Sequence, residues 1–122
     1  MSGYWGIQYR TGSGSDSMDL FGHQRPSWIL RWLGNDYWQI RNDNSGQCLG
    51  VGGASTAEGA HVIQWPCADI PDQRWYGRRN GGTYEFVNQN SGKCMAVGGS
   101  GMADGAPVIQ WKCLNTPDQK WY

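Results

Sequence analysis

Four cysteines are the residues of this chain whose type and spacing most clearly indicate chemistry. Cys48 and Cys67 lie 19 positions apart, and so do Cys94 and Cys113. Four thiols permit three disulfide pairings, or a tetrahedral zinc site built from thiolates. Zinc ligands usually come as close pairs, about two to four residues apart, and these cysteines do not. Disulfides are therefore favoured, and with them an oxidising compartment.

The cysteines belong to a segment that is present twice. Residues 42–76 and 88–122 are identical at 21 of 35 aligned positions, with a constant offset of 46 and no gap. A repeat of this length indicates one structural unit used more than once. The repeat favours pairing within each copy, since this gives two equivalent loops, each stabilising the fold by about 3 kcal/mol in the chain-entropy model.

Short strands and tight turns must position these residues. Residues 37–41 and 83–87 alternate as strands do, and each segment leads into Asn-Ser-Gly, whose glycine can take the positive φ of a turn. Each copy continues with a short apolar strand at its first cysteine, a Gly-rich loop, the motif Val-Ile-Gln-Trp, a Pro-Asp loop and a closing Trp-Tyr strand. This order, with 19 glycines and almost no helical periodicity, predicts an all-β barrel or sandwich.

Residues 1–36 contain features of a third, degenerate copy. An alternating segment begins at Tyr4, and Trp28 follows a proline and a serine where the other copies read Asp-Gln-Arg or Asp-Gln-Lys before tryptophan. This segment is shorter than the other copies and lacks both cysteines and the Val-Ile-Gln-Trp motif. We expect a shortened third lobe; the alternative is an arm outside the symmetry.

Length and charge limit the classes of function. A chain of 122 residues fits one domain, and 10 basic against 10 acidic residues disfavour a nucleic-acid partner held by a broad basic field. No stretch approaches the roughly 20 apolar residues of a membrane span. The first residues lack the charged and apolar regions of a signal peptide. Because the cysteines indicate secretion, we expect a mature or excised chain, possessing no leader of its own.

Catalysis, metal binding and cofactors are not expected. Glycoside hydrolysis requires two carboxylates at a set separation, and the two glutamates, Glu58 and Glu85, fall in different copies. No Ser/His/Asp arrangement stands out. His23 and His61 are isolated in the sequence, which disfavours a metal site.

Three spaced blocks resemble those of the ricin B-chain lectin family, which includes carbohydrate-binding modules of bacterial xylanases and related hydrolases. The blocks are Gly-x-Cys-[Leu/Met]-x-Val, Val-x-Gln-Trp-x-Cys and Gln-x-Trp; all three occur twice, in register, within residues 37–122. Residues 1–36 match only weakly.

The resemblance implies a β-trefoil made of three pseudo-repeats in a single domain, residues 1–122. Its lobes would lie at about 1–36, the degenerate and shortened one, 37–82 and 83–122. The resemblance also implies the disulfides Cys48–Cys67 and Cys94–Cys113. It further implies that the Gln-x-Trp tryptophans, Trp75 and Trp121, with Trp28 as a candidate third, are core residues.

A shallow sugar site in each clear lobe is a further implication. The family places an aromatic platform shortly before the second cysteine and an Asn-Gln pair near the end of the lobe. A flat indole covers the C–H face of a pyranose at low entropy cost, and polar side chains then orient the hydroxyls. The carbohydrate-binding residues predicted in this way are Trp65, Asp72 and Gln73 in one lobe and Trp111, Asp118 and Gln119 in the other.

Each of these residue types also has a structural alternative. Strand alternation allows Trp65 to share a buried face with Ile63, and the same holds in the second copy. A hydrogen bond within the lobe explains the glutamines as well as a sugar contact does. The aspartates follow proline, which is equally consistent with a turn role.

One position departs from the family pattern. The family's sugar-binding carboxylate lies two residues after the first cysteine, where this chain has Gly50 and Ala96. Neither side chain can accept a hydrogen bond, so the usual clamp on vicinal hydroxyls is absent. Glu58 and Asp104 occupy the following loop and match each other, but nothing in the sequence places them at a site.

The prediction is a secreted, non-enzymatic lectin or carbohydrate-binding module, with galactose- or xylose-type glycans as partners. It could be one module of a larger secreted protein. Each site should be weak, near millimolar or about −4 kcal/mol, and gain avidity on a multivalent glycan. The alternative is a trefoil that binds a protein, as a protease inhibitor or toxin docking domain does, with the sugar sites lost. A scaffold with no small-molecule site is the third interpretation.

Overall fold

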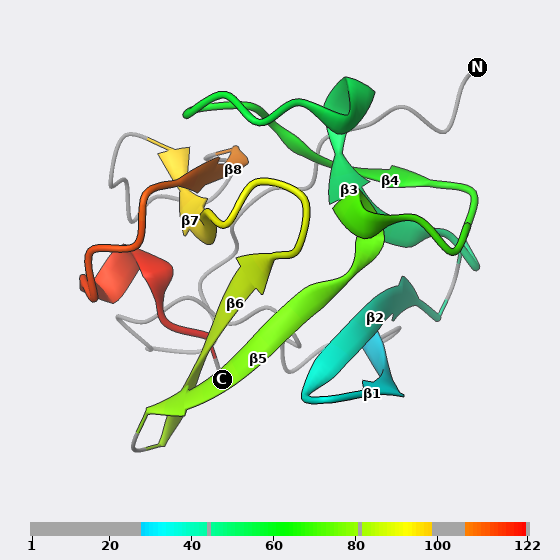
Figure 1. The fold of residues 1–122 in the computed structure, drawn as a ribbon, viewed down its shortest axis with the longest axis horizontal. Coiled ribbons are helices and arrows are strands. Elements are labelled where there is room, and N and C mark those ends of the chain that lie inside the picture. Colours follow the sequence, from blue (N-terminus) through cyan, green and yellow to red (C-terminus); the bar gives the residue numbers. More distant parts are fainter. Residues whose placement is uncertain (1–27, 44, 81, 99–106, 122) are drawn as a thin grey trace.

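The computed structural model describes residues 28–43, 45–80, 82–98 and 107–121, and the predicted degenerate lobe falls largely outside these ranges. Antiparallel strands joined by turns and short 3-10 segments make up the described chain (Figure 1). The strands are β1 (Trp28–Gly34), β2 (Tyr37–Asn42), β3 (Cys48–Val51), β4 (Val62–Trp65), β5 (Trp75–Asn80), β6 (Thr83–Asn88), β7 (Cys94–Val97) and β8 (Val108–Trp111). The 3-10 segments are η1 (Gly52–Ala54), η2 (Pro71–Gln73) and η4 (Pro117–Gln119).

The two sequence copies fold into two copies of one structural unit. The strands follow the order β4-β3-β2-β5-β6-β7-β8, and β1 pairs with β2. In both copies the first cysteine lies opposite the tryptophan of Val-Ile-Gln-Trp, as Cys48↔Trp65 and Cys94↔Trp111. In Figure 1, β3 and β4 lie on one side of β5, and β7 and β8 lie on the other. The all-β prediction is confirmed, and the repeat positions two equivalent strand pairs.

The hairpin β1–β2 repeats the hairpin β5–β6. Trp28 lies opposite Asn42 as Trp75 lies opposite Asn88. Trp28 thus occupies the closing-tryptophan position of the preceding lobe, and it packs, partly buried, against the core. The β1–β2 hairpin differs in a register shift between Trp32 and Gly34, which makes it one residue longer.

The closing tryptophans are core residues, as expected. Trp75 is 0% exposed and Trp121 is 1% exposed. Each indole N–H donates a hydrogen bond of 3.1 Å to a backbone carbonyl two strands earlier in its lobe, that of Leu49 or Met95. A buried indole needs such an acceptor, because an unpaired donor would lose the hydrogen bonds that water supplies. These bonds tie the end of each lobe to its first cysteine strand.

Turns and disulfides also agree with the sequence. Gly46 and Gly92 both have φ of 72°, and each donates its N–H to the carbonyl of the asparagine four residues earlier. The disulfides are Cys48–Cys67 and Cys94–Cys113, with Cα–Cα distances of 5.0 and 5.1 Å. Within the described ranges, no helix is long and apolar enough to cross a membrane.

Candidate functional site

The two predicted platform tryptophans lie at the surface. Trp65 ends β4 with 43% of its surface exposed, and Trp111 ends β8 with 37% exposed. The isoleucines two residues earlier, Ile63 and Ile109, are 6% and 9% exposed. The tryptophans are therefore partly exposed, whereas the isoleucines are buried. Each lobe presents an indole to which a ligand has access.

Gln73 holds the loop that follows Trp65. Its amide oxygen accepts a hydrogen bond from Ala68 N at 2.8 Å, and its amide nitrogen donates to Pro66 O at 3.1 Å. The side chain is 1% exposed. Both ends of the amide are thus used within the lobe, and the structure favours the structural role that the sequence left open. Gln73 positions the site without reaching its surface.

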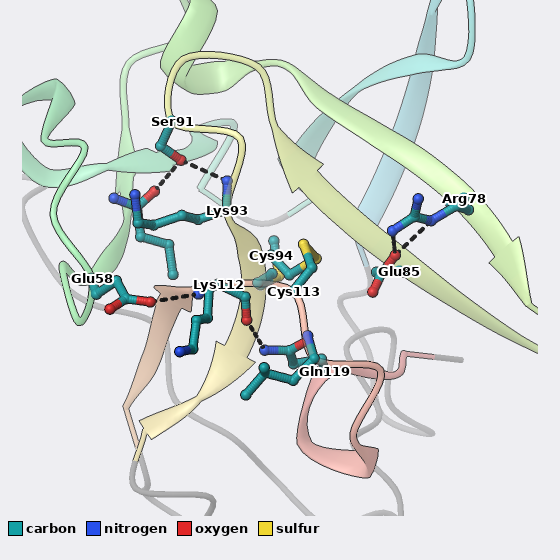
Figure 2. The surroundings of a disulfide bond; sticks show 12 residues. Glu58, Arg78, Glu85, Ser91, Lys93, Cys94, Lys112, Cys113 and Gln119 are labelled. Atoms are coloured by element: carbon teal, nitrogen blue, oxygen red, sulfur yellow. Dashed lines mark hydrogen bonds and ion pairs between the residues drawn. A yellow bond between two sulfur atoms is a disulfide. The ribbon is translucent and has the colours of Figure 1, made fainter.

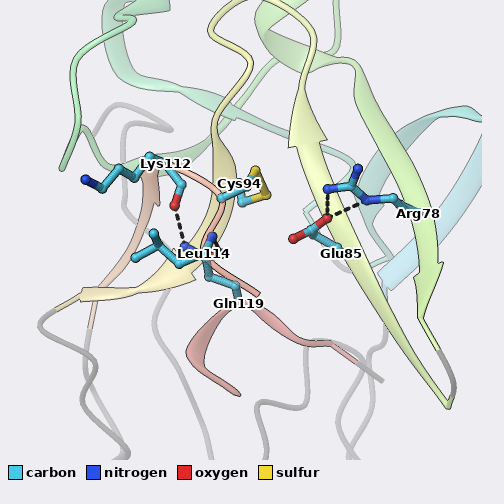
Figure 3. A network of polar contacts seen from close by, with 7 residues as sticks. Arg78, Glu85, Cys94, Lys112, Leu114 and Gln119 are labelled. Carbon is cyan, nitrogen blue, oxygen red and sulfur yellow. Dashed lines mark hydrogen bonds and ion pairs between the residues drawn. A yellow bond between two sulfur atoms is a disulfide. The ribbon is translucent and has the colours of Figure 1, made fainter. Parts of the chain in front are cut away.

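The second lobe repeats this arrangement. Gln119 accepts from Leu114 N and donates to Lys112 O, both at 2.8 Å, and is 1% exposed (Figures 2 and 3). Both glutamines were predicted as sugar contacts, whereas the structure gives their side chains hydrogen bonds within their own lobes. Each glutamine fixes the backbone of the loop that follows the exposed tryptophan of its lobe.

The aspartates beside these glutamines differ between lobes. Asp72 is 7% exposed and its Oδ2 atom accepts from Val51 N at 3.3 Å. It packs over Gly50, where an added Cβ would lie 2.9 Å from that same oxygen. Gly50, the position that breaks the family pattern, therefore leaves the space that the Asp72 carboxylate fills. A carboxylate is present beside this strand after all, carried by a different residue.

Asp118 occupies the equivalent position in the second lobe. There, Ala96 supplies the methyl group that Gly50 lacks, and the alanine is 1% exposed. Asp118 is partly exposed, and within the described part of the chain its carboxylate makes no hydrogen bond or ion pair. It is thus the more accessible acceptor of the two.

Glu58, whose place the sequence could not determine, lies beside the second lobe's tryptophan. Its Oε2 atom accepts a hydrogen bond from Lys112 N at 3.2 Å, immediately after Trp111 (Figure 2). The neighbouring Gly59 lies beside the indole, where an added Cβ would be in ordinary van der Waals contact with Trp111 Cζ3, at 3.7 Å. The first lobe thus contributes a carboxylate to the edge of the second lobe's site. Asp104, the matching acid, lies outside the described residues.

Gln110 fixes the loop that carries Glu58. This fully buried side chain donates to Ser55 O and Ala57 O, both at 2.9 Å, and accepts from the Ser91 hydroxyl at 2.8 Å. The loop backbone also pairs with β8, through Gly59 N to Gln110 O at 2.8 Å. Gln64, the equivalent residue, shares only the serine contact among the bonds described. The sequence motif contains both glutamines but does not reveal this difference.

Glu85 lies within 4.8 Å of the sulfurs of Cys94 and Cys113, a grouping that resembles a metal site (Figure 2). The sulfurs are joined to each other, so neither offers the thiolate that a metal requires. The Glu85 carboxylate instead accepts from Arg78 Nε at 2.6 Å, in an ion pair visible in Figure 3. This cluster is therefore structural.

Comparison with known proteins places these features among sugar-binding folds. Residues 24–111 and 78–122 match the family described as Ricin-type beta-trefoil lectin domain-like. No curated protein sequence matches the chain. Among solved structures, the designed three-fold symmetric protein ThreeFoil is similar at 32% identity and a TM-score of 0.78, covering 88% of this chain and 81% of that one.

Two natural proteins are also similar in structure. For 1,3Gal43A, an exo-β-1,3-galactanase from Clostridium thermocellum, identity is 26% and the TM-score 0.76, over 85% of this chain. For the hemolytic lectin CEL-III, identity is 27% and the TM-score 0.59, over 80% of this chain. The chain spans 23% of the galactanase and 28% of the hemolytic lectin.

Proposed function

Because the chain belongs to the ricin-type β-trefoil lectin-like family, we propose that it binds glycans through two shallow sites centred on Trp65 and Trp111, without catalysis of its own. The observation that carries this proposal is the pair of exposed indoles at equivalent positions, each followed by a loop that a buried glutamine clamps. An indole held in this way can stack on a sugar ring with little loss of side-chain entropy.

The two sites are proposed to differ in strength. At Trp111, the exposed Glu58 carboxylate accepts from the backbone N–H that follows the indole, and Asp118 of the same lobe is partly exposed. At Trp65, the Asp72 carboxylate is only 7% exposed and is therefore less accessible to a sugar. Hydrogen bonds to a charged acceptor are stronger than neutral ones, so a sugar should bind more tightly at Trp111.

Galactose- or xylose-type sugars are the proposed ligands. One similar protein is named an exo-β-1,3-galactanase and another a hemolytic lectin, which supports galactose-containing glycans as the first class to test. Because the chain spans only 23% of the galactanase, we propose that it serves as one module of a larger protein. Two disulfides support a secreted location.

Titration of tryptophan fluorescence and calorimetry test this proposal directly. Galactose, lactose, xylo-oligosaccharides and chitin fragments would be titrated into the parent chain, Trp65→Ala, Trp111→Ala and the double variant. Trp111→Ala should remove most of the binding, and the double variant all of it. Trp32→Ala is the matched control, because this tryptophan is 60% exposed and lies on β1, outside both copies of the repeat.

Two outcomes would contradict the proposal. Binding that survives in the folded double variant would place the sugar elsewhere. If the parent chain bound no glycan on a broad array, the result would favour the alternative, a trefoil that recognises a protein partner.

A further inference from the structure

An open cleft of about 860 Å³ lies between the β1–β2 hairpin and the loop that follows Trp65. Three arginines line it: Arg31 from β1, Arg41 from β2 and Arg74 from the segment after η2. Among the described residues that line it, Asp69 is the one acidic residue. In a chain whose formal net charge is zero, this is a local excess of positive charge.

Arg31 and Arg41 project from the same face of the hairpin. Arg31 lies opposite Gln39 on β2, and Arg41 follows Gln39 by two residues, so all three side chains share one face. Neither arginine makes a hydrogen bond or an ion pair within the described part of the chain. Both guanidinium groups are therefore available to a ligand.

Arg74 is differently placed. It forms an ion pair with Asp69, and its Nη1 atom lies 3.5 Å from Gln89 Oε1. This partial neutralisation leaves the cleft with two free guanidinium groups and one that is already oriented. Tyr37 and Gln39 add an aromatic ring and an amide to the same lining, which are groups suited to a sugar ring and its hydroxyls.

In the equivalent hairpin, the matching arginine has an acidic partner within the protein. Counted from the closing tryptophan, Arg78 on β5 corresponds to Arg31, and it lies opposite Glu85. Glu85, 7% exposed, accepts two hydrogen bonds from Arg78. The residue at the Glu85 position in the first hairpin is Gln39, which carries no charge. The two hairpins thus have the same arginine, and only one has its internal counter-ion.

We propose that this cleft binds the anionic group of an acidic sugar, a carboxylate or a sulfate ester, in a glycan also contacted at Trp65. The proposal extends the glycan binding inferred above. The planar fork of a guanidinium matches such groups with two parallel hydrogen bonds. The loop that follows Trp65 forms one wall of the cleft, so one ligand can reach both sites.

Paired ligands provide the test. Oligogalacturonides, sulfated galacto-oligosaccharides and neutral galacto-oligosaccharides of equal length would be titrated at two salt concentrations. The acidic ligands should bind about tenfold more tightly than the neutral ones at low salt, with a preference that falls as salt screens the charges. The relative affinities of the first two ligands distinguish carboxylate from sulfate.

Two variants then locate the acidic preference. Arg31→Gln with Arg41→Gln should abolish it and leave neutral-sugar binding unchanged. Gln39→Glu should lower the preference from about tenfold to about threefold, because the new carboxylate gives Arg31 the partner that Glu85 gives Arg78. Arg79→Gln is the matched control, an exposed arginine on the other hairpin, and should change nothing. Thermal unfolding of each variant checks that the fold is intact.

The failures of the two proposals are distinguishable. Equal affinity for acidic and neutral ligands, or an acidic preference that survives the double arginine variant, would overturn the cleft proposal while leaving the tryptophan sites standing. Acidic ligands that bind through the arginines while neutral sugars fail at both tryptophans would overturn the proposed lectin sites and leave the cleft.

Discussion

The lobe that contains Trp65 and the lobe that contains Trp111 share strands, turns, disulfide and glutamine clamp, yet they place their carboxylates differently. In the first lobe, Asp72 is buried over Gly50 and accepts from the backbone. In the second, Ala96 fills that space, Asp118 is partly exposed, and Glu58 arrives from the other lobe. One methyl group and one interlobe loop therefore distinguish two sites that the repeat makes look the same.

The hairpins differ in the same way. Arg31 faces the neutral Gln39, whereas Arg78 faces Glu85 and forms an ion pair with it. The backbone registers agree over most of their length. The comparison teaches that the residues which build this fold are few and repeated, while the residues between them are free to acquire separate functions.

The largest expected effect comes from removing the buried core tryptophan that each lobe contains. Trp75→Ala and Trp121→Ala should each lower the free energy of unfolding by about 3–5 kcal/mol, because each leaves a large cavity and a carbonyl without its donor. Urea denaturation measures this. The control Trp32→Ala should cost less than about 1 kcal/mol. Markedly unequal losses at the two core positions would show that the lobes are not equivalent in their cores.

The loop clamps come next. Gln73→Ala and Gln119→Ala should each lower the free energy of unfolding by about 2 kcal/mol, because each leaves a backbone N–H and a backbone carbonyl without a hydrogen-bond partner. Sugar affinity should fall in the same lobe, since the tryptophan loses its fixed backbone. Gln47→Ala serves as control, because this glutamine is partly exposed and its side chain makes none of the described hydrogen bonds. If either clamp variant kept full stability and affinity, the proposed positional role would be wrong.

An exchange of Gly50 and Ala96 sharpens the comparison of the carboxylates. Gly50→Ala places a Cβ against Asp72 Oδ2 and the Gln73 Cγ atom, so the carboxylate must move outward, at a cost of about 1–2 kcal/mol. The first lobe should then resemble the second, with tighter sugar binding at Trp65. Calorimetry in a Trp111→Ala background detects this. Ala96→Gly is the reciprocal variant. If sugar affinity were unchanged in both variants, Asp72 and Asp118 would have no part in ligand binding.

The smallest expected effect concerns Glu58, the residue that the first lobe places beside the tryptophan of the second lobe. Glu58→Gln keeps the shape of the side chain but removes its charge, and should weaken sugar binding at Trp111 about threefold, or 0.6–0.7 kcal/mol. In a Trp65→Ala background the second site is measured alone. Asp43→Asn, an exposed acid on another turn, is the control. Unchanged affinity at Trp111 in this background would contradict the role proposed for Glu58.

Much of the fold was accessible from sequence because its signals are local. The Asn-Ser-Gly turns depend on one glycine with positive φ, and the strands at 37–41 and 83–87 depend on simple alternation. The disulfides followed from the family resemblance, in agreement with the spacing. Of the predicted third lobe, the described residues begin at Trp28, and the register of Trp28 matches that of Trp75.

The site was less accessible, because its roles depend on which way a side chain faces. Alternation alone allowed Trp65 to be buried, but the strand ends there and the indole faces solvent. The glutamines were expected equally as sugar contacts and as structural residues, and only their 1% exposure and their backbone bonds distinguish the two roles. No pattern in the chain indicated a cleft between Arg31, Arg41 and Arg74.

The sequence by itself determined the repeat and the strand-and-turn order, because each depends on neighbouring residues or on matched spacing. The core tryptophans and the positions of the candidate platforms followed from the family resemblance. Tertiary structure alone decided that Glu58 serves the other lobe's tryptophan, that Asp72 fills the space over Gly50, and that Arg31 lacks the counter-ion that Arg78 has. These contacts either join residues that are far apart in the chain or depend on a single methyl group. They exist only once the strands pair and the two lobes pack together.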